Sequence, residues 1–181
     1  MCSIIDINDN ADPCNKNIGG TEDIAYYALL ADFAAFPDLP LSETDLEDKF
    51  LILSGFTFKT GKCWKKLQLS KDSGRLSYES VGNAGALSAV FNFGVAGNNL
   101  HGQLLNNLAD NLTPYVFLVQ RNSMPAGRYD LVGSDVHKAA LKGGYDGGEK
   151  SGNGGMYNFE ARATQKFETH YSGTVQLTPQ A

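Results

Sequence analysis

Residues 86–119 read ALSAVFNFGVAGNNLHGQLLNNLADNLTPYVFLV, and the spacing of the apolar residues changes twice within this stretch. Phe91, Phe93 and Val95 alternate with smaller or polar residues, as in a strand with one buried face. Residues 115–119 form an almost continuous apolar run, which indicates a strand buried on both faces or at a subunit contact. The stretch therefore predicts a mainly β fold in which a different element connects two strands.

The connecting element is predicted to be a helix. Asn98 or Asn99 can cap its first turn, because an asparagine side chain accepts a hydrogen bond from a free backbone N–H. Asn111 and Pro114 end the helical pattern. Four leucines are expected to form one apolar stripe on this helix: Leu100, Leu104, Leu105 and Leu108.

Further strands are predicted on both sides of this stretch. Residues 50–59 and 62–70 flank Thr60-Gly61 and together predict a hairpin. The turn formers Asp72-Ser73-Gly74 precede a strand over 75–81. Apolar runs at 128–132, 158–163 and 175–177 bring the expected number of strands to about nine.

Three segments have no single assignment from the sequence. Residues 24–31 fit either a helix or a strand buried on both faces. Residues 32–49 mix large apolar residues with two prolines and several acids, so we expect a long loop that binds something or covers a local core. Residues 143–155 contain seven glycines and predict a mobile loop or hairpin tip. No glutamate stands there at the position that a calcium loop requires.

Length and composition predict one acidic, soluble domain. The 181 residues are 42% apolar, carry a formal charge of −5, and are expected to form a single domain over 1–181 with an N-terminal arm at 1–20. The arm begins with a short strand-like run at Ile4, Ile5 and Ile7. Three cysteines at irregular spacing, together with a first segment that lacks a signal-peptide pattern, predict neither disulfide dependence nor secretion.

Charge is distributed unevenly along the chain. Residues 1–50 carry a net charge of −9, residues 51–100 carry +4, and the remainder is balanced. Opposite patches can pair within one chain, or they can join copies head to tail. Two separately solvated faces are the simpler interpretation.

No motif specifies an enzyme, a metal site or a cofactor. His101, His137 and His170 lack partners at ligand spacing, and residues 55–63 miss the spacing of a phosphate-binding loop. Cys63 is expected to pack inward rather than to act as a nucleophile. Asparagines within the uncharged run 80–109 argue against a membrane span. Net negative charge disfavours nucleic-acid binding, for which the lysines of residues 59–71 are the only candidate.

The order of these segments resembles tailed-bacteriophage tail tube proteins. The similarity lies in TPYVFLVQRNS at 113–123, YDLVGS at 129–134 and GGYDGGEKSGNGGMYNFEARA at 143–163. It covers roughly residues 98–177 best, and the first fifty residues match only in CNKNIGG at 14–20. The resemblance implies a β-sandwich or half-barrel with one flanking helix. Six copies would form a ring whose inner strands close a continuous barrel.

The same resemblance implies a structural virion protein without an active site. Its rings would stack into a hollow tail tube, assembled in the host cytoplasm, that delivers the genome. Double-stranded DNA would pass through the lumen without specific binding, and the tape measure, terminator and baseplate proteins would be its other partners. The loop at 32–49 would act as an inter-ring arm. The expected subunit-interface residues are Phe33, Phe36, Leu39, Leu41, Asp45, Glu47, Lys59, Lys62, Lys65 and Lys66.

Two alternatives stay open on the sequence. The first keeps the fold but changes the role, to a tail terminator or tube-completion ring, or to the tube of an injection machine. The second is a monomeric β-sandwich that binds carbohydrate. In that case the aromatic side chains stacking on sugar rings would be Tyr26, Tyr27, Trp64 and Tyr145.

Overall fold

The computed structural model describes residues 19–41, 48–83, 85–97, 99–109, 113–149 and 154–179, and within them the fold is mainly β with one α-helix. Two short 3₁₀ turns, Leu30–Asp32 and Asp48–Phe50, lie in the excursion between the first and third strands. The prediction of a mainly β fold with one helix is confirmed. The elements are β1 Thr21–Leu29, β2 Phe33–Ala35, β3 Leu51–Ile52, β4 Thr57–Phe58, β5 Lys65–Gln68, β6 Arg75–Val81, β7 Ala86–Ala96, α1 Leu100–Leu108, β8 Tyr115–Arg121, β9 Tyr129–Val132, β10 Ala140–Gly148, β11 Gly154–Gln165 and β12 His170–Tyr171.

A six-stranded sheet runs in the order β3-β12-β9-β8-β1-β5. Its strand β8 is the apolar run of the sequence, and Tyr115 to Val119 are fully buried. Alternate residues of β8 face two different cores, because successive side chains of a strand point to opposite faces. The predicted burial on both faces is confirmed. Residues 24–31, which the sequence left open, belong mostly to β1.

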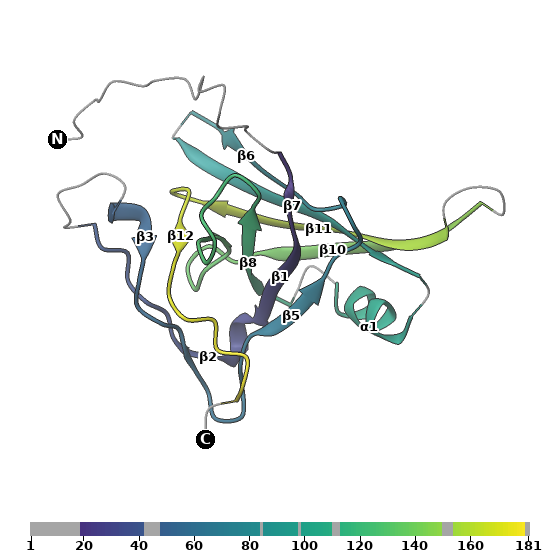
Figure 1. Cartoon of the computed structure of the whole chain (residues 1–181). Coiled ribbons are helices and arrows are strands. Elements are labelled where there is room, and N and C mark those ends of the chain that lie inside the picture. The colour runs from purple at the N-terminus through teal and green to yellow at the C-terminus, as the bar shows by residue number, and fades with distance from the viewer. Residues whose placement is uncertain are drawn as a thin grey trace.

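A four-stranded sheet runs in the order β10-β11-β7-β6, with every pair antiparallel. Strand β7 pairs with β11 from Ala96↔Met156 to Leu87↔Gln165, so these two long strands form its centre. The hairpin of β10 and β11 extends beyond the rest of the sandwich, and α1 lies beside it (Figure 1). Residues 143–148 and 154–155 therefore lie on the two strands of a hairpin, one of the two expected forms, and the strands continue into the glycine-rich segment from both sides.

The two sheets pack face to face around a first core. Phe91 and Phe93 of β7 lie against Phe117 of β8, with ring centroids 6.0 and 6.2 Å apart. Phe159 of β11 stacks on Phe93 at 5.1 Å. The alternation of Phe91, Phe93 and Val95 thus marks the core-facing side of β7, as predicted. None of the described sheets closes into a barrel within the chain.

A second core covers the opposite face of the six-stranded sheet. Phe33 lies at its centre, with ring centroids 4.6 Å from both Phe36 and Phe58 and 5.2 Å from Trp64. The excursion that leaves β1 and returns at β5 supplies these rings. Burying large aromatic side chains contributes much of the stability of such a cluster. The long loop therefore covers a local core, one of its two expected roles.

The predicted hairpin around Thr60-Gly61 is wrong. The turn itself forms, with the N–H of Lys62 donating to the carbonyl of Lys59 at 3.0 Å and Gly61 at φ +77°. However, β5 pairs with β1 and β4 pairs with β2. Trp64 lies between the turn at Thr60-Gly61 and strand β5, and it is 1% exposed. After the turn the chain therefore places Trp64 in the second core and does not pair with the strand before the turn.

One further expectation is wrong, and another is correct in part. Residues 175–177 form no strand, although the carbonyl of Gln176 accepts a hydrogen bond from the N–H of Trp64 at 3.0 Å. The prediction of one apolar stripe on α1 holds for Leu100, Leu104 and Leu108, which are exposed, whereas Leu105 is buried and faces the sandwich. The predicted cap is confirmed at Asn99, whose Oδ1 accepts the N–H of Gly102 at 2.7 Å.

Candidate functional site

Both outer strands of the four-stranded sheet have an unpaired edge among the described residues. Strand β10 pairs only with β11, and β6 pairs only with β7. Each edge presents a row of backbone N–H and C=O groups, which can pair with a strand of another chain. Neither edge is short, since β6 has 7 residues and β10 has 9. The sheet is therefore open to extension at both ends.

The face of this sheet that points away from the first core is polar and electrically balanced. Residues that pair directly across neighbouring strands point to the same face of a sheet. Asn92 of β7 and Glu160 of β11 pair with each other on this face, and their outer partners are Arg75 and Lys142. Glu160 also pairs with Arg162 at 3.3 Å. The charged residues of this face are Arg75, Glu79, Lys142, Asp146, Glu160 and Arg162, three of each sign.

The apolar residues expected at a subunit interface divide into two groups. Phe33 is buried in the second core, and Phe36 and Leu39 are partly buried beside it. These three side chains pack within their own chain. Leu41 is exposed at the end of the described part of the loop. Asp45 and Glu47, the two acidic residues of the same prediction, lie outside the described residues.

The four expected interface lysines also have different surroundings. Lys62 forms an ion pair with Asp32 at 2.9 Å, and Lys59 donates to the carbonyl of Ala31 at 2.8 Å. Both lysines therefore brace the turn that follows β1. Lys65 and Lys66 lie on β5, one of the two outer strands of the six-stranded sheet, and are exposed. The structure thus leaves Lys65 and Lys66 as the basic pair at that edge.

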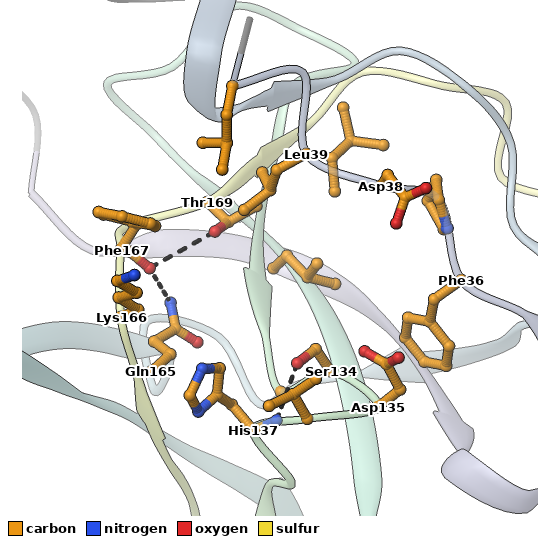
Figure 2. Close-up of a pocket in the computed structure, with 16 residues that line it drawn as sticks. Phe36, Asp38, Leu39, Ser134, Asp135, His137, Gln165, Lys166, Phe167 and Thr169 are labelled. Carbon is orange, nitrogen blue, oxygen red and sulfur yellow. Dashed lines mark hydrogen bonds between the residues drawn. The ribbon is translucent and has the colours of Figure 1, made fainter.

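A pocket of about 310 Å³ lies between the excursion and the end of β9 (Figure 2). Phe36 and Leu39 line one side, and Ser134 and His137 line another. The N–H of His137 donates to Oγ of Ser134 at 2.9 Å, so the serine closes a tight turn. None of these groups forms an arrangement of nucleophile and base. The pocket is a mixed apolar and polar depression beside the second core.

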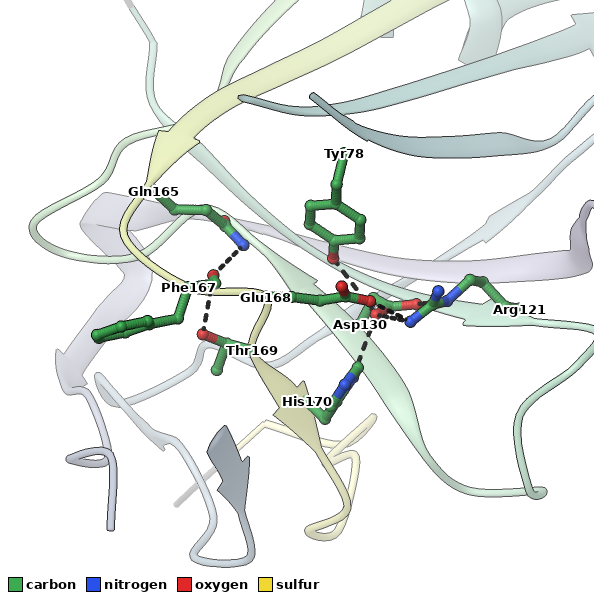
Figure 3. A network of polar contacts seen from close by, with 8 residues as sticks. All are labelled: Tyr78, Arg121, Asp130, Gln165, Phe167, Glu168, Thr169 and His170. Atoms are coloured by element: carbon green, nitrogen blue, oxygen red, sulfur yellow. Dashed lines mark hydrogen bonds and ion pairs between the residues drawn. The ribbon is translucent and has the colours of Figure 1, made fainter. Parts of the chain in front are cut away.

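A polar network joins the two sheets at one end of the sandwich (Figure 3). Asp130 of β9 is fully buried, and Arg121 of β8 donates to both of its oxygens, at 2.7 and 2.9 Å. Arg121 also bonds Glu168. The hydroxyl of Tyr78 on β6 donates to Asp130 at 3.3 Å. Nδ1 of His170 lies 3.2 Å from Asp130, at ion-pair distance but outside hydrogen-bond geometry.

Burial and charge shift two pKa values in this network. Burial raises the pKa of Tyr78 strongly, and the charges of Asp130 and Glu168 raise it further. For Arg121, burial lowers the pKa, but the ion pairs with Asp130 and Glu168 outweigh it and leave the pKa raised. Arg121 therefore keeps its charge and balances the buried aspartate, as a buried ion pair requires.

The same network contains three potential metal ligands. Ligand atoms of Asp130, Glu168 and His170 all lie within 4.8 Å of one another. The guanidinium of Arg121 contacts both carboxylates and supplies positive charge between them. Because a cation would have to share that place with a guanidinium, the geometry fits a structural ion-pair network.

Sequence reasoning missed Tyr78, Arg121 and Asp130 as a group. The one available signal is an aspartate inside the strand sequence YDLV, since an acid in a buried strand requires a partner. The sequence does not name that partner. Tyr78 lies 52 positions from Asp130, and only the packing of the two sheets brings them together.

The aromatic residues proposed for a sugar-binding surface are not presented together. Trp64 belongs to the second core, and Tyr26 packs against that same core. Tyr27 packs against the first core, on the opposite face of β1. Tyr145 is the exposed member, with its ring 4.7 Å from that of Tyr157. The four rings therefore offer no common platform.

Cys63 is buried, as predicted, with Nζ of Lys65 3.5 Å from its sulfur.

The one α-helix in the described part of the chain lacks the length and apolar character that crossing a membrane requires. Comparison of the chain with protein-family models, with curated proteins and with solved structures gives no match.

Proposed function

We propose that this chain is a structural virion protein, the subunit of a phage tail tube built from stacked hexameric rings. The observation that carries the proposal is the four-stranded sheet, whose edges β6 and β10 pair with no further strand in the described part of the chain. Edge strands of this length are an aggregation hazard in a monomer. Closing the sheets of several copies into one barrel removes every such edge.

The direction of the strands suits ring closure. All three pairings in the sheet are antiparallel, so β10 and β6 run in opposite directions. Rotation about a ring axis preserves strand direction, and β10 of one copy would therefore meet β6 of the next as an antiparallel pair. Four strands from each of six copies would then continue a single ladder pattern around the ring.

The two edges are also displaced along the strand direction. Register across the sheet places Arg75, Asn92, Glu160 and Lys142 in one row. From that row β6 extends one way and most of β10 extends the other way. Strands in a barrel must tilt and stagger their register, so a diagonal offset between edges favours closure.

The polar face of the sheet would line the lumen. Its six charged residues balance to zero, and no cluster of one sign covers it. A wall without a basic patch does not hold the phosphates of double-stranded DNA by counterion release. The duplex could then slide through, and no enzyme activity or cofactor is part of this role.

Attraction between oppositely charged surfaces would hold neighbouring rings together in the stack. Lys65 and Lys66 at the β5 edge belong to the basic part of the chain, and the first fifty residues are acidic. Unlike faces favour head-to-tail contact between rings. The loop at 32–49 would contribute to that contact through its outer end near Leu41. The tape measure, terminator and baseplate proteins would meet the ends of the tube.

Negative-stain electron microscopy with light scattering on the purified chain tests the proposal. Sixfold rings or hollow tubes are expected. Single rings that never stack would identify a terminator or tube-completion ring instead. A strictly monomeric chain at high concentration contradicts self-assembly.

Edge pairing can be tested with proline, which lacks the backbone N–H that a ladder needs. Successive N–H groups of a strand point to opposite sides, so Gly144→Pro and Gly147→Pro remove groups of opposite direction on β10. The variant whose N–H faces away from β11 should keep the monomer's stability but abolish rings. Gly144→Ala and Gly147→Ala are matched controls, because nothing lies within 4 Å of either added Cβ. Normal tubes from both proline variants would contradict the assembly route.

A further inference from the structure

The helix α1 presents an apolar stripe that no described residue covers. Leu100, Leu104 and Leu108 are 77%, 58% and 39% exposed. At 3.6 residues per turn these three leucines lie along one side of the helix. Gly102, which faces the sandwich, lies on nearly the opposite side, and buried Leu105 lies about 100° around the helix from the middle of the stripe. The helix carries no charged residue, so its outer side is unusually apolar for a solvated surface.

The helix lies directly against the edge strand β10 and its partner. A Cβ at Gly143 would approach Oδ1 of Asn106 to 2.7 Å, and a Cβ at Gly102 would approach the ring of Tyr157 to 2.5 Å. Both strand residues face the six-stranded sheet, so α1 packs on that side of the β10–β11 hairpin (Figure 1). A strand that pairs with β10 would therefore come to lie beside α1.

The other edge of the sheet carries a matching hollow on the same side. Tyr78 is the middle residue of β6, and its side chain points to the six-stranded sheet and reaches Asp130. Next to that network lies a pocket of about 420 Å³ whose lining includes Phe50, Met124 and Pro125. Arg121 and Glu168 also line it, but they are paired with each other. Arg128 and His170 line it as well, so the hollow combines apolar contacts with polar ones.

Full pairing of the two edges brings helix and hollow together. Gly144 is the middle residue of β10, and Gly143 beside it contacts α1. If β6 of a second copy pairs along β10 so that the core-facing residues of both strands lie on one side, its Tyr78 lies opposite Gly143 or Tyr145. The core-facing sides of two paired strands are on the same side of the joined sheet. The second copy's hollow then faces the leucine stripe.

We infer that the leucine stripe of α1 is a subunit contact, and that its occupant is the Phe50, Met124 and Pro125 surface of the next copy in the ring. This inference rests on the proposed function, because it uses the pairing of β10 with β6. It adds the residues that join neighbouring copies outside the barrel ladder. The leucines supply the apolar area that an isolated ladder of edge strands lacks.

The first test places charge on the stripe. Leu100→Lys with Leu104→Lys should leave the far-ultraviolet circular dichroism and the urea midpoint of the monomer unchanged, because both side chains are exposed. Rings and tubes should be lost. Leu53→Lys is the matched control, at a leucine that is 69% exposed in a different part of the molecule. Wild-type tubes that also form from the double variant overturn the inference and leave the proposed function standing.

The second test identifies the occupant by cross-linking. Cys2→Ser and Cys14→Ser remove the native cysteines other than buried Cys63, and Leu104→Cys or Met124→Cys is then added to separate copies. Oxidised assemblies of the mixed copies should give a covalent dimer, whereas either copy alone should not. An equal yield when Leu53→Cys replaces Met124→Cys would overturn the assignment. A wild-type chain that never assembles overturns the inference together with the proposed function.

Discussion

At the scale of single residues, Asp130 is the polar group on which the sandwich depends most directly. It is fully buried and accepts hydrogen bonds from Arg121 and Tyr78, which come from different sheets. Asp130→Asn removes the charge but keeps the shape, and it leaves the Arg121 guanidinium short of its partner. Breaking one side of a buried ion pair costs about 3–5 kcal/mol. Urea unfolding should show a loss near the lower end of this range, because Arg121 is partly exposed.

Tyr78→Phe is the matched comparison for that variant. It removes one neutral donor to Asp130 and keeps the aromatic ring, so it should lower the free energy of unfolding by about 1 kcal/mol. A loss as large as that of Asp130→Asn would mean that the tyrosine hydroxyl, rather than the ion pair, holds the network together.

The raised pKa of Tyr78 also predicts a pH dependence. Burial raises it first, and the neighbouring carboxylates add to the effect, from an ordinary value of 10.0. Above about pH 10 the unfolded chain loses this proton while the folded chain retains it. The stability that Tyr78 contributes is therefore complete below pH 10 and falls as the pH rises further.

Urea midpoints measured between roughly pH 9 and 11 check this prediction. The wild-type chain should lose stability over the range, and Tyr78→Phe should lose less. Tyr27, Tyr129 and Tyr171 have pKa values raised by burial as well, so some loss should remain in the variant. Identical slopes for both chains would contradict a buried, neutral Tyr78.

At the scale of elements, strand β10 requires a glycine at position 143 because its neighbours come very close there. A Cβ at Gly143 would lie 2.6 Å from the ring of Phe159 and 2.7 Å from Asn106 of α1. Gly143→Ala should therefore destabilise the chain by about 1–3 kcal/mol through overpacking. Thermal unfolding followed by circular dichroism measures the change.

Gly144→Ala is its control on the next residue. Nothing lies within 4 Å of an added Cβ there, and the backbone has no positive φ. Its stability should stay within about 0.5 kcal/mol of wild type. Equal losses at both positions would indicate that the strand itself, and not the packing of α1, requires glycine.

At the scale of the whole molecule, charge separation predicts a salt-sensitive assembly. Lys65→Glu with Lys66→Glu reverses the basic pair at the β5 edge and should block stacking while the monomer stays folded. Lys62 is left unchanged, because reversing it would place two acids side by side at Asp32. Electron microscopy and light scattering at low and high salt provide the measurement.

Lys138→Glu serves as the control for that reversal, since Lys138 is exposed on the connection between β9 and β10 and is not part of β5. It makes a smaller change in net charge at a site outside the stacking surface, and tubes should form. Wild-type tubes should shorten or dissociate as salt rises, because exposed charges are screened beyond about 10 Å at 0.1 M ionic strength. Normal tubes from the Lys65 and Lys66 variant would contradict the electrostatic part of the proposal.

Features that depend on near neighbours along the chain could be predicted from the sequence. The alternation in β7, the apolar run of β8, the strand at Arg75–Val81 and the Asn99 cap were all predictable, because period and capping are local properties. The tail-tube resemblance also came from the order of such segments, and it stays a prediction.

Tertiary structure alone decided which surfaces meet. An apolar period shows that a strand is buried but not which strand it pairs with, so β5 was assigned to β4 and instead pairs with β1. The leucines of α1 have helical spacing, yet only the position of the hairpin decides that Leu105 faces the core and Leu100 faces outward. Asp130 finds Tyr78 and Arg121 for the same reason. Contacts between distant residues depend on how the two sheets pack, and local spacing carries no information about that packing.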